Sequence, residues 1–159
     1  MSTTAPQKIG FIGLGIMGAP MAGHLRAGGH QLYVHTRGAV PRALVDVGAV
    51  VCADAAAVAR EAEIVFLMLP DTPDVETVLF GENGVAAGLS AGKTVVDMSS
   101  ISPIATKDFA ERIRALGADY LDAPVSGGEV GAKAASLTIM VGGEVAAFER
   151  VKPLFALMG

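Results

Sequence analysis

The sequence has no tryptophan, only one cysteine, and aromatic residues at 5% of its 159 positions. Because Cys52 has no second cysteine to pair with, an intramolecular disulfide and a cysteine-based metal site are both excluded, and a reducing, cytoplasmic setting is expected. Histidine is sparse as well. His24, His30 and His35 are spread along the chain, so we expect them to have packing or surface roles rather than to bind a metal.

Long apolar runs and an excess of positive charge are also missing. Hydrophobic residues make up 52% of the chain, but the longest strongly apolar run, residues 64–69, is far shorter than the roughly 20 residues that cross a bilayer. The net charge of −4 provides no basic surface for nucleic acid. A secretory signal is a weak alternative interpretation of the apolar run after Lys8. We therefore expect a protein that binds neither membranes nor nucleic acid.

Glycine, by contrast, is abundant at 20 residues, and three glycines define the first motif. An apolar run at residues 9–12 leads into the motif G-x-G-x-x-G, and apolar residues at four-residue steps follow it. This order predicts a strand, a tight turn and a helix. In a dinucleotide site, Gly13 would make the turn, Gly15 would let a pyrophosphate approach the backbone, and Gly18 would allow close packing of helix on strand.

The rest of the chain alternates between the two kinds of periodicity. Strands are expected at residues 9–12, 31–35, 48–52, 63–69, 93–98, 118–122 and 137–141. Helices are expected between Gly18 and Gly28 and at residues 41–47, 55–60, 74–80, 104–116 and 144–158, with Asp54 and Ser102 as N-caps. Residues 81–92 are expected to form a loop with at most one helical turn. This alternation predicts an α/β fold, a doubly wound and mostly parallel sheet of the Rossmann type.

In such a sheet the ligand crevice lies outside the carboxyl ends of the strands. Four predicted loops share that edge: the glycine turn, Leu69-Pro70, Ser99-Ser100, and the glycine-rich segment 126–128. A lone G-x-G-x-x-G motif is a weak indicator, but the common placement of these loops strengthens the prediction of a dinucleotide site.

The end of the second predicted strand is the position that contacts the adenosine ribose. Thr36-Arg37 stands there, about twenty residues beyond the glycines, and no acidic residue is present to bind a free 2′-hydroxyl. An arginine can instead pair with a 2′-phosphate. The sequence therefore favours NADP over NAD, although a solvated surface arginine remains the alternative interpretation.

Four segments resemble the β-hydroxyacid dehydrogenase family over nearly the whole chain. They are GFIGLGIMGAPMAGHL at 10–25, FLMLPDTPDVETVLFGENG at 66–84, VDMSSISP at 96–103 and DAPVSGGEVGAKAASLTIMVGG at 122–143. The resemblance implies reversible hydride transfer between NAD(P) and a small 3-hydroxy acid or the corresponding semialdehyde. The sequence is most similar to members that reduce tartronate semialdehyde to glycerate, and members that act on 3-hydroxyisobutyrate share most of these motifs.

The resemblance also implies roles for individual residues. The pyrophosphate would be held by Gly13, Leu14, Gly15, Ile16, Met17 and Gly18. The remaining cofactor contacts would come from Thr36, Arg37, Met68, Leu69, Pro70 and Ser100. The carboxylate or hydroxyl of the substrate would be bound by Ser126, Gly127 and Gly128.

The catalytic lysine of the family is expected beyond Gly159, together with an all-helical domain that mediates dimerisation. None of Lys8, Lys93, Lys107, Lys133 and Lys152 fits the role, and Lys133 is interpreted as a solvated loop residue. No catalytic residue is therefore assigned within this chain, which is expected to bind cofactor with almost no turnover. A complete, non-catalytic dinucleotide-binding module is the alternative.

Overall fold

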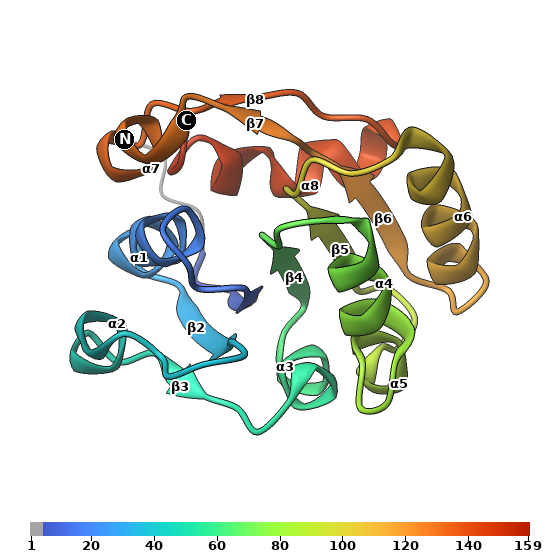
Figure 1. The fold of residues 1–159 in the computed structure, drawn as a ribbon, viewed down its shortest axis with the longest axis horizontal. Helices are drawn as coiled ribbons and strands as arrows, with labels where there is room; N and C mark the ends of the chain where they lie inside the picture. The colour runs from blue at the N-terminus through green and yellow to red at the C-terminus, as the bar shows by residue number, and fades with distance from the viewer. Residues whose placement is uncertain (1–4) are drawn as a thin grey trace.

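Residues 5–159 are described by a computed structural model, and they form a parallel sheet covered by helices on both faces (Figure 1). The strand order is β3-β2-β1-β4-β5-β6. These strands are β1 (Lys8–Ile12), β2 (Gln31–His35), β3 (Val50–Val51), β4 (Ile64–Leu67), β5 (Thr94–Asp97) and β6 (Asp119–Asp122). The order reverses between the neighbours β1 and β4, which is where a ligand crevice is expected. The predicted α/β fold class is confirmed.

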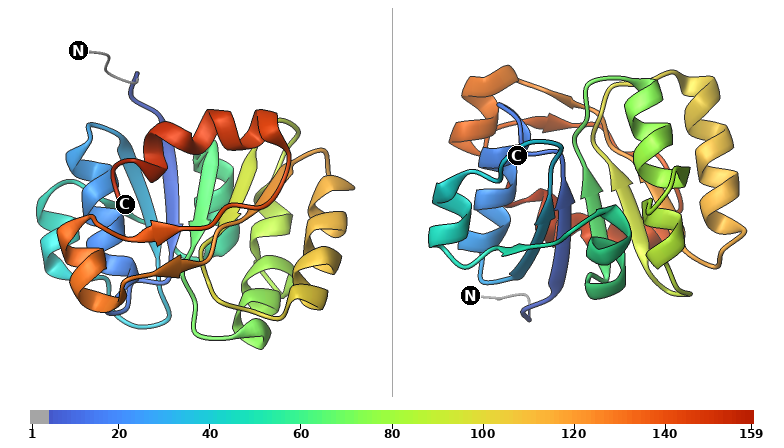
Figure 2. Two further views of the ribbon diagram at one scale, coloured as in Figure 1. Left: turned by 90° about the horizontal axis from the view of Figure 1, so that it is seen from above. Right: turned by 60° about the horizontal axis from the view of Figure 1, so that its bottom comes forward.

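Every strand of this sheet except β3 contributes to two cores, because successive side chains point to opposite faces of the sheet. In β4, Phe66 belongs to one core, whereas Val65 and Leu67 belong to the other. The core around Phe66 is covered by α1 (Gly18–Ala27), α2 (Arg42–Asp46), α7 (Gly128–Ala134) and α8 (Val145–Phe155). The opposite core is covered by α3 (Ala55–Glu61), α4 (Thr72–Phe80), α5 (Val85–Gly88) and α6 (Pro103–Arg114) (Figure 2).

Polar side chains fix where several helices begin. The carboxylate of Asp54 accepts a hydrogen bond from the amide of Ala57 at 2.8 Å, and Ser102 Oγ accepts one from the amide of Ala105 at 3.4 Å. Both bonds satisfy backbone donors that the first turn of a helix leaves unpaired. The two predicted N-caps are therefore confirmed.

The segment after β6 differs from the sequence-based prediction. Residues 126–128 were expected to form a loop and 137–141 a further strand. Instead, β7 (Val125–Ser126) pairs antiparallel with β8 (Thr138–Ile139) in a separate two-stranded sheet, and α7 lies between them. Two-residue strands have no measurable periodicity, and the paired glycines obscure the start of α7.

Some predicted element bounds are also too wide. The strand expected at 48–52 is only the two residues of β3, an exposed edge strand. The helix expected at 144–158 is α8, which ends at Phe155. The possible turn within 81–92 is α5. In the described part of the chain, no helix combines the length and apolar character needed to cross a membrane.

Candidate cofactor-binding site

The turn between β1 and α1 requires glycine at its first and last motif positions. Gly13 has φ of +97°, a conformation that side chains disfavour, and its amide donates a hydrogen bond to the carbonyl of His35 at 3.1 Å. A Cβ on Gly18 would collide with the Gly13 carbonyl oxygen. The fold alone therefore explains why these two positions are glycine.

Gly15 differs from these two glycines. A Cβ at this position would meet no atom within 4 Å, and its φ lies outside the left-handed region. The amide groups of Gly15, Ile16 and Met17 find no acceptor among residues 5–159. Because unpaired amides at the start of a helix favour an anion, open space over Gly15 suits the approach of a phosphate group.

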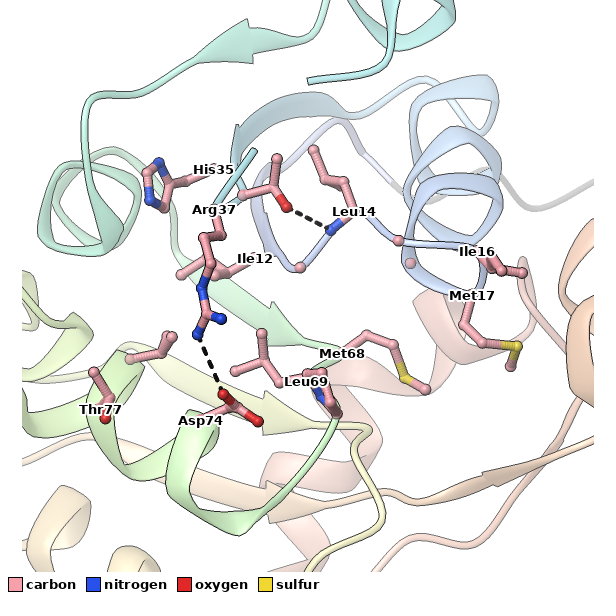
Figure 3. A pocket seen from close by; sticks show the side chains of 16 residues that line it. Ile12, Leu14, Ile16, Met17, His35, Arg37, Met68, Leu69, Asp74 and Thr77 are labelled. Carbon is pink, nitrogen blue, oxygen red and sulfur yellow. Dashed lines mark hydrogen bonds and ion pairs between the residues drawn. The ribbon is translucent and has the colours of Figure 1, made fainter. Parts of the chain in front are cut away.

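A hollow of about 610 Å³ opens beside this turn at the carboxyl edge of the sheet (Figure 3). It is lined by every residue predicted from the sequence to contact the cofactor except Ser100. Five further lining residues were not predicted, namely Ile12, His35, Asp74, Thr77 and Val78. The lining is mainly apolar, with polar groups in a few places, as is usual for a small-molecule site.

Two residues after β2 connect the glycine turn to the far end of the hollow. The hydroxyl oxygen of Thr36 accepts a hydrogen bond from the amide of Leu14 at 3.2 Å. Arg37 Nη2 lies 3.2 Å from Asp74 Oδ1 across the hollow (Figure 3). No acidic residue directly follows β2 in the sequence, but α4 places Asp74 beside Arg37. The exposed pair stabilises the fold by only about 0–1 kcal/mol, so a ligand can replace it.

A buried hydrogen-bond network supports the opposite wall, formed by Met68, Leu69 and Pro70. The amide of Leu69 donates to Ser99 Oγ at 2.8 Å, and the amide of Ser99 donates to Asp97 Oδ1 at 3.0 Å. The Tyr120 hydroxyl donates to Asp97 Oδ2 at 3.1 Å. Burial raises the pKa of Asp97 to about 6, although the hydrogen bonds from Ser99 and Tyr120 act to lower it. The sequence signal that could have found this network is an aspartate inside an apolar strand.

The remaining predicted site residues do not line the hollow. Ser100 follows β5 and is exposed. Ser126 ends β7 and is also exposed, while Gly127 and Gly128 have φ of +133° and +61°. Their segment is held near α1, because His24 Nε2 lies 2.8 Å from the carbonyl oxygen of Ala132 in α7. Their predicted contacts with cofactor and substrate stay predictions.

The five lysines lie away from the hollow. The interpretation of Lys133 as a solvated loop residue is wrong. Lys133 belongs to helix α7, and its ammonium lies 2.8 Å from a carboxylate oxygen of Glu129. The Lys93 ammonium donates to the carbonyl oxygens of Ala59 and Arg60. Among the described residues, no three histidine, cysteine or acidic side chains are grouped as a metal site would need.

The sheet order, the glycine turn and the hollow together define a dinucleotide-binding domain of the Rossmann class. Comparison with known proteins supports the same assignment: residues 8–159 match a family model described as the NAD binding domain of 6-phosphogluconate dehydrogenase. The chain belongs to the β-hydroxyacid dehydrogenase family and contains its NAD-binding domain.

Three relatives show the extent of the similarity. The 2-hydroxy-3-oxopropionate reductase of Escherichia coli is 60% identical over 152 residues, which cover 96% of this chain and 52% of that protein. The structure of Mycobacterium tuberculosis 3-hydroxyisobutyrate dehydrogenase with L-serine has a TM-score of 0.88 and 33% identity, and covers 98% of this chain and 53% of that one. The structure of Psf3 in complex with NADP+ and 2-OPP has a TM-score of 0.86 and 34% identity, and the match covers 94% of this chain and 54% of that one. The chain spans about half the length of the curated relatives it matches.

Proposed function

We propose that this chain binds NADP(H) and NAD(H) in the hollow, with the pyrophosphate at the glycine turn. The observation that carries the proposal is the pair of features at Gly15: open space above the residue, and adjacent amides without an acceptor among the described residues. Nothing in the packing of the turn requires glycine at this position. A bound pyrophosphate would use both features. The NADP+ in the Psf3 structure supports the choice of ligand.

We further propose a preference for NADP(H), based on Arg37. Its guanidinium lies at the end of the hollow that would hold the adenosine, and it can form charge-assisted hydrogen bonds with a 2′-phosphate. Calorimetric titration of the 159-residue chain should give a lower Kd for NADPH than for NADH. Arg37→Ala should abolish the preference for NADPH while leaving NADH affinity nearly unchanged. Equal affinities in the unmodified chain would contradict the NADP preference.

In the complete enzyme, the proposed reaction is reduction of tartronate semialdehyde to glycerate. A bound nicotinamide would supply the hydride. Ser126, Gly127 and Gly128 are proposed to hold the substrate's carboxylate or hydroxyl, because a hydroxyl beside successive backbone amides forms a small anion site. The proton for the developing alkoxide is proposed to come from a lysine outside residues 1–159, near the start of a long interdomain helix. The all-helical domain that follows this helix is proposed to mediate dimerisation. The 60% identity to 2-hydroxy-3-oxopropionate reductase supports this substrate.

A chimera tests the substrate proposal directly. Residues 1–159 are joined to the remaining half of the E. coli relative, and kcat/KM is measured for tartronate semialdehyde reduction and for 3-hydroxyisobutyrate oxidation. The expected result is NADPH-dependent turnover that favours tartronate semialdehyde and falls in Ser126→Ala. A preference for 3-hydroxyisobutyrate would support the second candidate, a 3-hydroxyisobutyrate dehydrogenase. A folded chimera that binds NADPH without turnover would instead favour a non-catalytic binding module.

A further inference from the structure

The Arg37–Asp74 pair joins two elements that lie on opposite sides of the hollow. Arg37 follows β2 and Asp74 lies in the first turn of α4, 37 positions later in the chain. Both residues line the hollow, and Figure 3 shows their side chains extending toward each other across it. The end proposed to hold the adenosine therefore contains a carboxylate as well as a guanidinium.

The two side chains differ in their freedom to move. The Arg37 side chain is 89% exposed, whereas the Asp74 side chain is 27% exposed and lies where a helix N-terminus favours negative charge. The Arg37 side chain can therefore turn from Asp74 toward a ligand more easily than the Asp74 side chain can move out of the hollow. A 2′-phosphate bound by Arg37 would have to compete with the Asp74 carboxylate and would remain close to its charge.

We propose that Asp74 is a specificity-determining residue that weakens NADP(H) binding relative to NAD(H). The proposal rests on the dinucleotide function proposed above. An adenosine 2′-hydroxyl is uncharged and meets no such competition, so Asp74 affects NAD(H) little. Arg37 favours the phosphate and Asp74 opposes it. The preference for NADP(H) is consequently smaller than Arg37 alone would produce, and the chain accepts both cofactors.

The test is the isosteric substitution Asp74→Asn, which removes the charge and keeps the size. Calorimetric titration of the 159-residue chain should show NADPH affinity raised by about threefold to tenfold, with NADH affinity changed by less than about twofold. Asp46→Asn is the matched control, because Asp46 pairs with Arg42 at 3.8 Å within helix α2, outside the hollow. This control should leave the ratio of the two affinities unchanged.

Two further measurements identify the cause. In an Arg37→Ala background, Asp74→Asn should raise NADPH affinity by less than it does when Arg37 is present, because no guanidinium remains to be released. Titration with 2′,5′-ADP and 5′-AMP, which differ only in the 2′-phosphate, examines the adenosine end alone. The gain from Asp74→Asn should appear with 2′,5′-ADP and be absent with 5′-AMP.

The outcomes separate the two proposals. If the unmodified chain and all variants bind neither NADPH nor NADH, the proposed function fails. Suppose instead that both cofactors bind. If the ratio of NADPH affinity to NADH affinity is the same in Asp74→Asn as in Asp46→Asn, or if Asp74→Asn lowers NADPH affinity, the role of Asp74 is overturned while the proposed function stands. Circular dichroism and thermal unfolding establish that each variant is folded.

Discussion

The amide of Leu69 donates a hydrogen bond to Ser99 Oγ at 2.8 Å, which attaches the wall of the hollow to a buried network ending at Asp97. Asp97 is fully buried, and its two carboxylate oxygens accept from Ser99 and Tyr120. The position of this wall therefore depends on a carboxyl group that no solvent reaches.

Asp97 should make the free energy of unfolding depend on pH. Below about pH 4 the Asp97 carboxyl is protonated in both the folded and the unfolded chain. Between about pH 4 and its folded pKa of about 6, the carboxyl loses its proton only in the unfolded chain. The free energy of unfolding should therefore fall as pH rises, by on the order of 3 kcal/mol once pH exceeds the folded pKa. In Asp97→Asn this contribution disappears, and the remaining slope includes Asp122, whose pKa burial also raises.

Urea unfolding measured from about pH 4 to about pH 7 tests this expectation. Asp108→Asn is the control, because Asp108 lies on the exposed surface of α6 and pairs with Arg112 at 3.4 Å. The control should keep the slope of the unmodified chain. An unchanged slope in Asp97→Asn would mean that the buried carboxyl does not titrate in this range.

Gly15→Ala should separate binding from folding. The added methyl meets no protein atom within 4 Å, so the melting temperature should stay close to that of the unmodified chain, while affinity for both cofactors falls by about tenfold or more because the methyl occupies the approach of the pyrophosphate. Gly23→Ala, in helix α1 and outside the hollow, is the control and should bind normally. Retained affinity in folded Gly15→Ala would place the pyrophosphate elsewhere.

The 159-residue chain should reduce tartronate semialdehyde at a negligible rate even when saturated with NADPH. None of its lysines lines the hollow, and a positioned acid typically contributes about 10²- to 10⁴-fold to such a reaction. Loss of NADPH absorbance is the measurement, with the E. coli reductase as the positive control. Turnover near that of the control would reveal an acid within residues 1–159.

Sequence patterns predicted the features that depend on local chemistry. Apolar runs predicted the central strands, Asp54 and Ser102 predicted helix starts, and the glycine spacing predicted the turn beside β1. Asp74 was missed as a partner of Arg37 because the two residues meet only through the sheet order, 37 positions apart. A strand was predicted at 137–141, where β8 lies, but β7, α7 and the antiparallel pairing were missed. Strands of two residues are too short to show a period.

The sharing of β4 between two cores limits how this family can change. An inserted residue would turn Phe66 toward the side now filled by Val65 and Leu67, and would disrupt both packed layers at once. Insertions within the strands are therefore strongly destabilising, whereas insertions in the segments just beyond the strands do not reverse the direction of core side chains. The proposed cofactor and substrate contacts at Arg37, Asp74 and Ser126 lie outside the strands of the parallel sheet, so these residues can be substituted without changing the packing of that sheet.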